Sequence, residues 1–354
     1  MQPSATTSAA DQLKRDIDSV RRDLTELIRK VTFTSLRDQT SDLDTKIANF
    51  PMRIQKVRER KYAFNKSLES HGLEYQKQWA AKRGQIQNQI TIQSNSLQAQ
   101  LRPLESKVAA LSLGSSSAVT VKTIMNEVNS FETRVSSVES SLRELFDSLK
   151  QEFEKSSRQV DLIEKALDLS ESASFGFLPG ECIYMTTKAI WTRDNKKDKE
   201  DPDGILFLTD QRLLFEQRQE IAKKKVLFVT TEREKVQKLQ FETPVVAIEN
   251  IKATKQGMFK NEDWLEFQLP SGSFAREVKL HLDGGDCNQW QQALNRVKSG
   301  EIEGDRALEV DMQAVEKARS APAKCPSCGG VITRPVLRGM DSITCDFCGA
   351  VIRL

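Results

Sequence analysis

The stretch GILFLTDQRLLFEQ, from Gly204 to Gln217, contains two apolar runs separated by the four polar residues TDQR. Apolar and polar residues alternate toward its end with the period of two that half-buried β-strands show. The polar residues Thr209–Arg212 can form a tight turn, so the stretch predicts two antiparallel strands joined as a hairpin.

Sequence on both sides of this hairpin continues the strand pattern. Further strands are expected in CIYMTTKAIWT before it and in KKKVLFVTT, KLQFETPVVAIENI, DWLEFQLP and REVKLHLD after it. The next segment, GGDCNQWQQALNRVKSG, predicts a helix in which Asp286 caps the start and Trp290, Leu294 and Val297 share one face. Six or seven strands followed by one helix indicate a small antiparallel barrel plugged by that helix, over residues 173–300.

Several motifs in this domain resemble the GRAM and bacterial PH-like families. They are LPGE (Leu178–Glu181), GILFLTDQRLLF (Gly204–Phe215), PVVAIENIKATKQG (Pro244–Gly257) and the helix that carries Trp290. The resemblance extends between residues 175 and 300. It implies a PH-type barrel whose relatives bind phosphoinositides, other lipids or proteins.

Two basic clusters are candidate contacts of this domain with a membrane or a partner. Lys196 and Lys197 lie in the loop RDNKKDKEDPDG, where neighbouring acidic residues cancel their charge. The second cluster, AKKKV, holds Lys223, Lys224 and Lys225 without interleaved acids and could approach an anionic surface. The alternative interpretation is a solvated strand edge that lysine protects from pairing with other strands.

The C-terminal segment contains two Cys-x-x-Cys turns, here called knuckles. Cys325 and Cys328 form the first, Cys345 and Cys348 the second, and sixteen residues separate them. The spacing is that of a four-cysteine zinc site. We therefore expect one structural Zn²⁺ in residues 322–354, with no coordination position left for catalysis. Disulfides and a redox Cys-x-x-Cys pair are the weaker alternatives.

The sequence between the knuckles predicts a β-hairpin with RGMD as its turn, and AVIRL adds a closing strand. The hairpin residues would be Val331, Ile332, Val336, Leu337 and Ile343. A segment this short has too little core to fold alone, so the metal would supply most of its folding energy. It resembles the zinc-ribbon family, whose members bind nucleic acid, dock proteins or staple a chain. Residues 301–321 would form a helical linker to it.

The N-terminal half carries heptad patterns typical of a coiled coil. One series runs from Leu13 to Val31 and another from Val121 to Leu149, with Leu142 and Leu145 both in its apolar positions. The segment SLGSSSAVT, near 112–120, predicts a turn, and Pro51 and Pro103 are expected to end or kink helices. We expect residues 1–10 to be disordered and 11–172 to form an extended helical hairpin. A helical bundle is the alternative, and self-association or the helices of 11–50 would cover the apolar stripe.

Charge and motif content narrow the function. The 53 basic and 50 acidic residues give a formal net charge of +3, which argues against nucleic acid as the main partner. The candidates for such binding are Arg334, Arg338 and Arg353. No phosphate-binding loop, nucleotide motif or catalytic constellation is present, and the N-terminus MQPSATTSAADQL has no apolar run.

We therefore expect a multidomain α+β protein that acts as a cytoplasmic, non-enzymatic adaptor or scaffold. It would oligomerise through its coiled coil and dock proteins or membranes through the PH-like domain and the ribbon. The alternative is a peripheral membrane protein that assembles on anionic lipid, by fold-level analogy with ESCRT-III-like assemblies. Nucleic-acid binding through the ribbon is the third and weakest interpretation.

Overall fold

The computed structural model describes residues 9–192, 201–226, 229–259 and 261–354, with the backbone alone for 221–226 and 229–234. The chain divides into two compact units. Unit 1 comprises Met1–Met52 and Glu69–Ser157, and unit 2 comprises Arg53–Leu68 and Arg158–Leu354. No helix in the described ranges combines the length and the apolar character that a membrane crossing requires.

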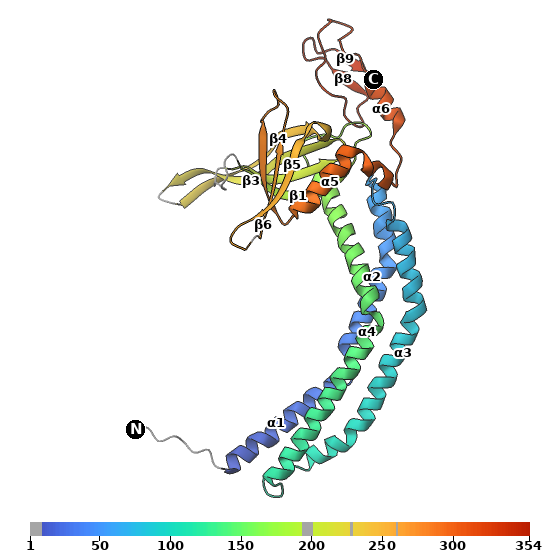
Figure 1. Cartoon of the computed structure of the whole chain (residues 1–354), viewed down its shortest axis with the longest axis vertical. Helices are drawn as coiled ribbons and strands as arrows, with labels where there is room; N and C mark the ends of the chain where they lie inside the picture. The colour runs from blue at the N-terminus through green and yellow to red at the C-terminus, as the bar shows by residue number, and fades with distance from the viewer. Residues whose placement is uncertain (1–8, 193–200, 227–228, 260) are drawn as a thin grey trace. The chain divides into compact units, whose positions relative to one another are not determined.

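Unit 1 is a helical bundle made of three rows of helix. Helix α1 (Ala9–Lys30) and the following α2 (Thr34–Glu59) form one row, and α3 (Leu68–Ala109) and α4 (Ala118–Glu171) form the other two (Figure 1). The ends of α2 beyond Met52 and of α4 beyond Ser157 belong to unit 2. Polar contacts join all three rows: Lys30 of α1 pairs with Glu132 of α4 at 2.5 Å. Arg83 of α3 pairs with Asp44 of α2 at 2.8 Å. The apolar stripe of α1 is buried within the unit, at Ile17, Val20, Leu24 and Leu27.

Of the two expected ways to cover the apolar stripe of the helical hairpin, the structure shows packing by the helices of residues 9–52. The turn between α3 and α4 lies where the glycine and serine run occurs, after Ala109 and before Ala118. Pro51 and Pro103, however, lie inside α2 and α3 and end neither helix.

The chain leaves α2 at residues 60–67 instead, where Tyr62, Ala63 and Phe64 are buried and backbone carbonyls have a side-chain partner. The side chains of Tyr62 and Phe64 are 1% and 0% exposed. The Arg58 guanidinium donates to the carbonyls of Tyr62 (2.8 Å), Phe64 (2.6 Å) and Asn65 (2.9 Å).

The heptad of α4 changes phase in its middle. Val121 to Leu142 follow the expected spacing, but Phe146, Leu149 and Phe153 then form the buried series, while Leu145 is 40% exposed. Two successive steps of four, from Val138 to Leu142 and from Leu142 to Phe146, insert a stutter that rotates the apolar stripe. The expectation that Leu145 lies in the apolar positions is therefore wrong.

Unit 2 contains a seven-stranded antiparallel sheet with the order β4-β3-β2-β1-β7-β6-β5. Its strands are β1 (Ile183–Thr192), β2 (Asp203–Thr209), β3 (Arg212–Val226), β4 (Val229–Pro244), β5 (Glu249–Gln256), β6 (Glu262–Gln268) and β7 (Glu277–Asp283). The hairpin turn falls at TDQR as expected, between Thr209 and Arg212. Pairing of β2 with β3 begins at Gly204 opposite Gln217, so the remainders of β3 and β4 extend past β2 as a two-stranded arm (Figure 1).

The core of the sheet is closed by helix α5 (Cys287–Ser299). Asp286 caps it as expected, since its carboxylate accepts from the amides of Asn288 and Gln289 at 3.0 Å each. Trp290, Leu294 and Val297 are all buried, which confirms their shared face. The hairpin strand β2 is buried on both faces rather than one, because the ring of Phe175 lies 5.0 Å from that of Phe207 on the side away from the core.

A short 3₁₀ turn, η1 (Val245–Ala247), lies between β4 and β5. The connection from α5 to the C-terminal cysteines contains η2 (Glu301–Asp305) and α6 (Met312–Arg319). The strands of the ribbon are β8 (Ser342–Thr344) and β9 (Val351–Arg353), which pair antiparallel across the second knuckle. The hairpin expected between the knuckles, with RGMD as its turn, is therefore wrong. Across the first knuckle, Lys324 and Val331 form an isolated bridge, and β8 is the strand that lies between the knuckles.

Candidate metal centre and buried polar network

The two knuckles have the same backbone geometry. The amide of Gly329 donates to the carbonyl of Cys325 at 2.8 Å, and that of Gly349 donates to Cys345 at 2.9 Å. Both glycines adopt φ of +72°, which residues with a Cβ rarely adopt. Glycine at these two positions lets each knuckle turn tightly enough to present both sulfurs on one side.

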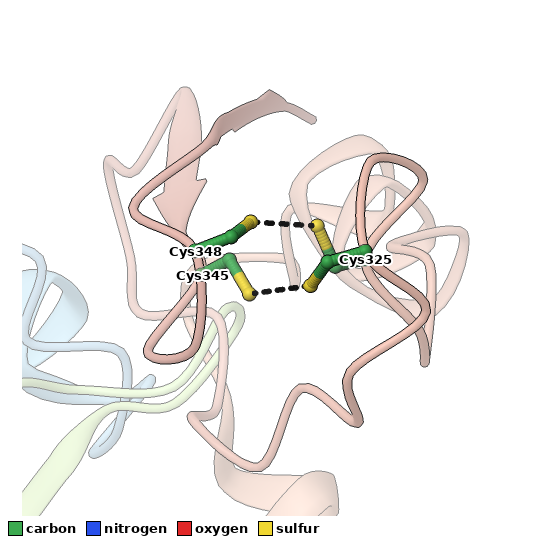
Figure 2. A group of neighbouring side chains, drawn as sticks. Cys325, Cys345 and Cys348 are labelled. Atoms are coloured by element: carbon green, nitrogen blue, oxygen red, sulfur yellow. Dashed lines mark hydrogen bonds between the residues drawn. The ribbon is translucent and has the colours of Figure 1, made fainter.

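The four thiols form one cluster that can hold a metal ion. Their sulfurs all lie within 4.8 Å of one another. Cys325 and Cys348 are 3.7 Å apart, as are Cys328 and Cys345 (Figure 2). A metal–sulfur bond of about 2.3 Å in a tetrahedral site gives sulfur–sulfur edges of about 3.8 Å. A disulfide would need sulfurs about 2.05 Å apart. The donor set therefore fits a tetrahedral thiolate-bound cation.

The electrostatics of the cluster also favour a cation. Hydrogen bonds from the amides of Cys328 and Ser327 lower the pKa of the Cys325 thiol. The Gly330 amide lowers the pKa of Cys328, but the neighbouring thiols outweigh it and raise that pKa. Thiolates this close repel one another unless a positive ion lies between them. Beneath them Cys325, Cys345 and Ile352 form a small buried core against which Ile332 and Ala350 pack. So few apolar residues leave the metal as the main source of folding energy.

The ribbon is attached to the sheet domain through the segment between its knuckles. The amide of Arg338 donates to the carbonyl of Phe177 at 2.8 Å, and its guanidinium lies 5.2 Å from the centre of the Phe177 ring. The neighbouring Leu337 packs on Gly176 so closely that a Cβ there would lie 2.6 Å from Leu337 Cδ1. These contacts join the ribbon to the sheet domain within unit 2.

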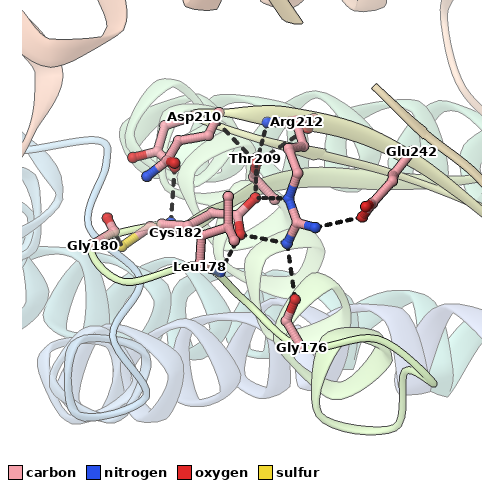
Figure 3. A network of polar contacts seen from close by, with 10 residues as sticks. Gly176, Leu178, Gly180, Cys182, Thr209, Asp210, Arg212 and Glu242 are labelled. Atoms are coloured by element: carbon pink, nitrogen blue, oxygen red, sulfur yellow. Dashed lines mark hydrogen bonds and ion pairs between the residues drawn. The ribbon is translucent and has the colours of Figure 1, made fainter. Parts of the chain in front are cut away.

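A buried ion pair joins two of the motifs that the sequence singled out. Glu181 of LPGE is 0% exposed, and its carboxylate accepts from Arg212 of TDQR at 3.0 Å (Nε) and 2.7 Å (Nη2) (Figure 3). The same carboxylate accepts from the Leu178 amide and the Thr209 hydroxyl, each at 2.6 Å. The pair therefore fixes the hairpin turn to the loop that precedes β1.

Arg212 is satisfied on its other sides as well. Its Nη2 also donates to the carbonyl of Gly176 at 2.8 Å, and Nη1 pairs with Glu242 of β4 (Figure 3). Burial lowers the pKa of Arg212, but Glu181 and Glu242 outweigh it and hold that pKa above its ordinary value. Because these groups bind one another, the network is a structural staple and not a ligand site. The sequence analysis did not predict this network. The signal that could have shown it is a charged residue in each of two otherwise apolar motifs, Glu181 in the first and Arg212 in the second.

Asp210, next in the turn, ties the linker to the sheet domain. Its side chain is 3% exposed, accepts from the Cys182 amide at 2.9 Å and pairs with Arg306, which follows η2. The Arg306 guanidinium also lies 4.9 Å from the centre of the Phe64 ring. Burial raises the pKa of Asp210 to about 6, outweighing the ion pair with Arg306.

A cavity of about 290 Å³ lies beside this network. Its wall includes Gly180, Cys182, Leu308, Val310 and Arg338. Burial raises the pKa of the Cys182 thiol, so this cysteine stays protonated and is a poor nucleophile.

The sequence-predicted basic residues fall in different places. Lys196 and Lys197 lie outside the described residues, and for Lys223, Lys224 and Lys225 only the backbone on the β3 arm is described. Arg334 pairs with Asp346 at 2.7 Å, and Arg338 lies on Phe177. Arg353 is exposed on β9. Because Arg334 and Arg338 have local partners, the three arginines do not form one uniform basic surface.

No family model and no curated protein matches the chain. Among solved structures, the N-terminal PH domain of Vps36 is 17% identical, with 35% of this chain and 83% of that one covered and a TM-score of 0.24. The DH/PH domains of p115-RhoGEF are 12% identical, with 82% and 91% covered and a TM-score of 0.23. The DH/PH domains of PDZ-RhoGEF, solved in complex with activated RhoA, are 10% identical, with 84% and 96% covered and a TM-score of 0.24.

Proposed function

We propose that the chain is a non-enzymatic cytoplasmic adaptor whose PH-like domain, of the GRAM type, and zinc ribbon dock other proteins. The observation that carries the proposal is the attachment of the four-cysteine ribbon to the sheet domain through Arg338 and Leu337. A metal-stabilised ribbon fixed in this way presents its outer surface in a defined position. A defined position is what a docking module needs and what a flexible tail lacks.

Zinc is the metal that we propose for the cluster. Cys325, Cys328, Cys345 and Cys348 would bind it as thiolates, which is the commonest ligand set of structural zinc. When bound, the ion stabilises the ribbon and offers no open coordination position. The cysteines' own contribution is to fix the two knuckles against each other.

The ribbon also has exposed apolar side chains that favour protein contact. Phe347 is 72% exposed, Val351 66% and Val331 54%. Aromatic residues at a rigid surface commonly dominate the energetics of protein interfaces. The helical region would set the stoichiometry by self-association, and it would do so through surfaces other than the α1 stripe, which is buried within unit 1.

Membrane docking is the second candidate. Support comes from the β3 arm with Lys223–Lys225, whose backbone extends past the position where β2 begins to pair with β3. Weak, salt-sensitive binding to anionic lipid would follow. Nucleic-acid binding is less well supported, because Arg334 and Arg338 already have partners.

The test is an affinity capture with the full chain, comparing wild type with Phe347→Ser and with the matched variant Val119→Ser. Val119 is 76% exposed on α4, far along the chain from the ribbon. We expect a reproducible protein partner that binds wild type and Val119→Ser and is lost with Phe347→Ser, while the zinc content is unchanged.

Two parallel assays cover the alternatives. Sedimentation with anionic vesicles that is lost in the Lys223→Glu, Lys224→Glu, Lys225→Glu triple variant would favour the membrane candidate instead. Nucleic-acid binding that falls steeply with salt and is lost in Arg353→Ala would contradict the adaptor proposal.

A further inference from the structure

The connection between β5 and β6 ends in two large apolar side chains exposed to solvent. Met258 is 92% exposed and Phe259 is 82% exposed, the highest values among the large apolar residues of the described ranges. The strands pair as far as Gln256 opposite Glu262, so both residues lie beyond the last paired position, at the hairpin tip. Gly257, with φ of +86°, begins the turn that presents them.

A collar of paired charges lies directly behind this tip. Lys255 pairs with Asp263 at 3.1 Å and with Asp286 at 3.0 Å. These carboxylates hold the pKa of Lys255 above its ordinary value. The hairpin is therefore amphipathic along its length. Its tip is apolar, and the charged side chains behind the tip pair with one another.

We propose that Met258 and Phe259 insert into the interfacial region of a lipid bilayer and form a hydrophobic membrane contact. A stable protein interface buries about 800 Å² on each partner, far more than two side chains at a convex tip can supply. A bilayer interface needs no complementary groove, since lipids rearrange around a protruding apolar group while the charged collar stays in water. The contact rests on the membrane candidate above but uses a different site from Lys223–Lys225.

The two membrane sites differ in how they respond to salt. Contact through the lysine cluster is electrostatic, and salt screens it. Contact through the tip depends on burial of apolar surface, and Asp263 and Asp286 pair with Lys255, the lysine of β5 that lies behind the tip. Binding through the tip should therefore occur on phosphatidylcholine vesicles and persist at high salt.

The experiment is sedimentation of the full chain with phosphatidylcholine vesicles at 0.1 and 0.5 M NaCl (roughly 10 and 4 Å of screening length). The variants are Met258→Ser with Phe259→Ser, and the control Val246→Ser. Val246 is 72% exposed in η1, at the opposite end of β5 from the tip. We expect wild type and control to bind equally at both salt concentrations and the double variant to bind roughly 10- to 100-fold more weakly.

Depth of insertion gives an independent readout. A Phe259→Trp variant should show additional tryptophan emission that brominated phosphatidylcholine quenches, whereas the emission of wild type should be quenched far less. Because both residues are exposed, the substitutions should leave the thermal melting curve unchanged.

Three results would overturn the proposal. One is no sedimentation of wild type with phosphatidylcholine vesicles. Another is binding that the double variant retains but the Lys223–Lys225 charge-reversal variant loses, which leaves the lysine-based membrane candidate standing. The third is a change in oligomeric state of the double variant without vesicles, which would assign the tip to protein contact.

Discussion

At the scale of single residues, the most consequential feature is the buried pair of Glu181 and Arg212. Removing one partner of such a pair leaves an unpaired buried charge and commonly costs about 3–5 kcal/mol. Together with the Thr209 hydroxyl they join LPGE to TDQR, which are 28 or more residues apart. Each motif supplies one partner of this ion pair, Glu181 from LPGE and Arg212 from TDQR.

Asp210 makes the stability of unit 2 depend on pH. Its pKa is raised from 3.8 to about 6 in the folded state, so the folded chain binds its proton more tightly than the unfolded chain. The stabilisation is fully present below pH about 4 and is lost as the pH rises through about 6. An Asp210→Asn variant lacks this titration.

We therefore expect the free energy of unfolding of wild type, relative to Asp210→Asn, to fall by about 2–3 kcal/mol between pH 4 and pH 7. Urea denaturation followed by tryptophan emission measures it, since three of the four tryptophans, Trp191, Trp264 and Trp290, lie in unit 2. A difference that stays constant over this pH range would contradict the assignment.

At the scale of elements, α4 tests whether burial or heptad position decides stability. Leu142 is 4% exposed and Leu145 is 40% exposed, although the simple heptad places both in the apolar stripe. Leu142→Ala should destabilise unit 1 by about 2–5 kcal/mol, because it leaves a cavity in the bundle. Leu145→Ala should change stability by no more than about 0.5 kcal/mol.

Thermal unfolding followed by circular dichroism at 222 nm compares the two variants, since the four long helices dominate that signal. Equal destabilisation by the two variants would mean that Leu145 is buried like Leu142. It would contradict the phase change that places Phe146 in the buried series. The pair is matched, because both variants replace leucine with alanine three residues apart on one helix.

At the scale of the whole molecule, the metal should control the ribbon and its attachment without controlling the sheet. Cys345→Ser, or removal of metal with a chelator, should unfold residues 322–354 and release Arg338 from Phe177, because the ribbon's own core is too small to hold it. The seven-stranded sheet has its own core around Trp290 and should stay folded.

Metal analysis should find one zinc per chain in wild type and in Cys182→Ser, and a large loss in Cys345→Ser. Hydrogen exchange should show protection lost over 322–354 and kept in β1–β7. A chain that stays fully protected after complete metal removal would show that the cysteines have no structural role as metal ligands.

The sequence by itself determined those features that local patterns encode. Alternating residues placed the hairpin turn at Thr209–Arg212, Asp286 and Trp290 placed α5, and the Cys-x-x-Cys spacing brought the four candidate ligands together. Each of these depends on residues a few positions apart, where backbone geometry fixes which side chains share a face. The ribbon ligands could be predicted for a second reason, since four cysteines at this spacing commonly bind one metal ion.

Only the tertiary structure decided which faces meet. A heptad shows that a face is apolar but not whether a second chain or the helices of residues 9–52 will cover it, and it cannot show the stutter at Phe146. The pairing of Glu181 with Arg212 and the packing of Leu337 on Gly176 join residues far apart in sequence. Such contacts depend on how the chain closes its loops and fills its core, which no local period records.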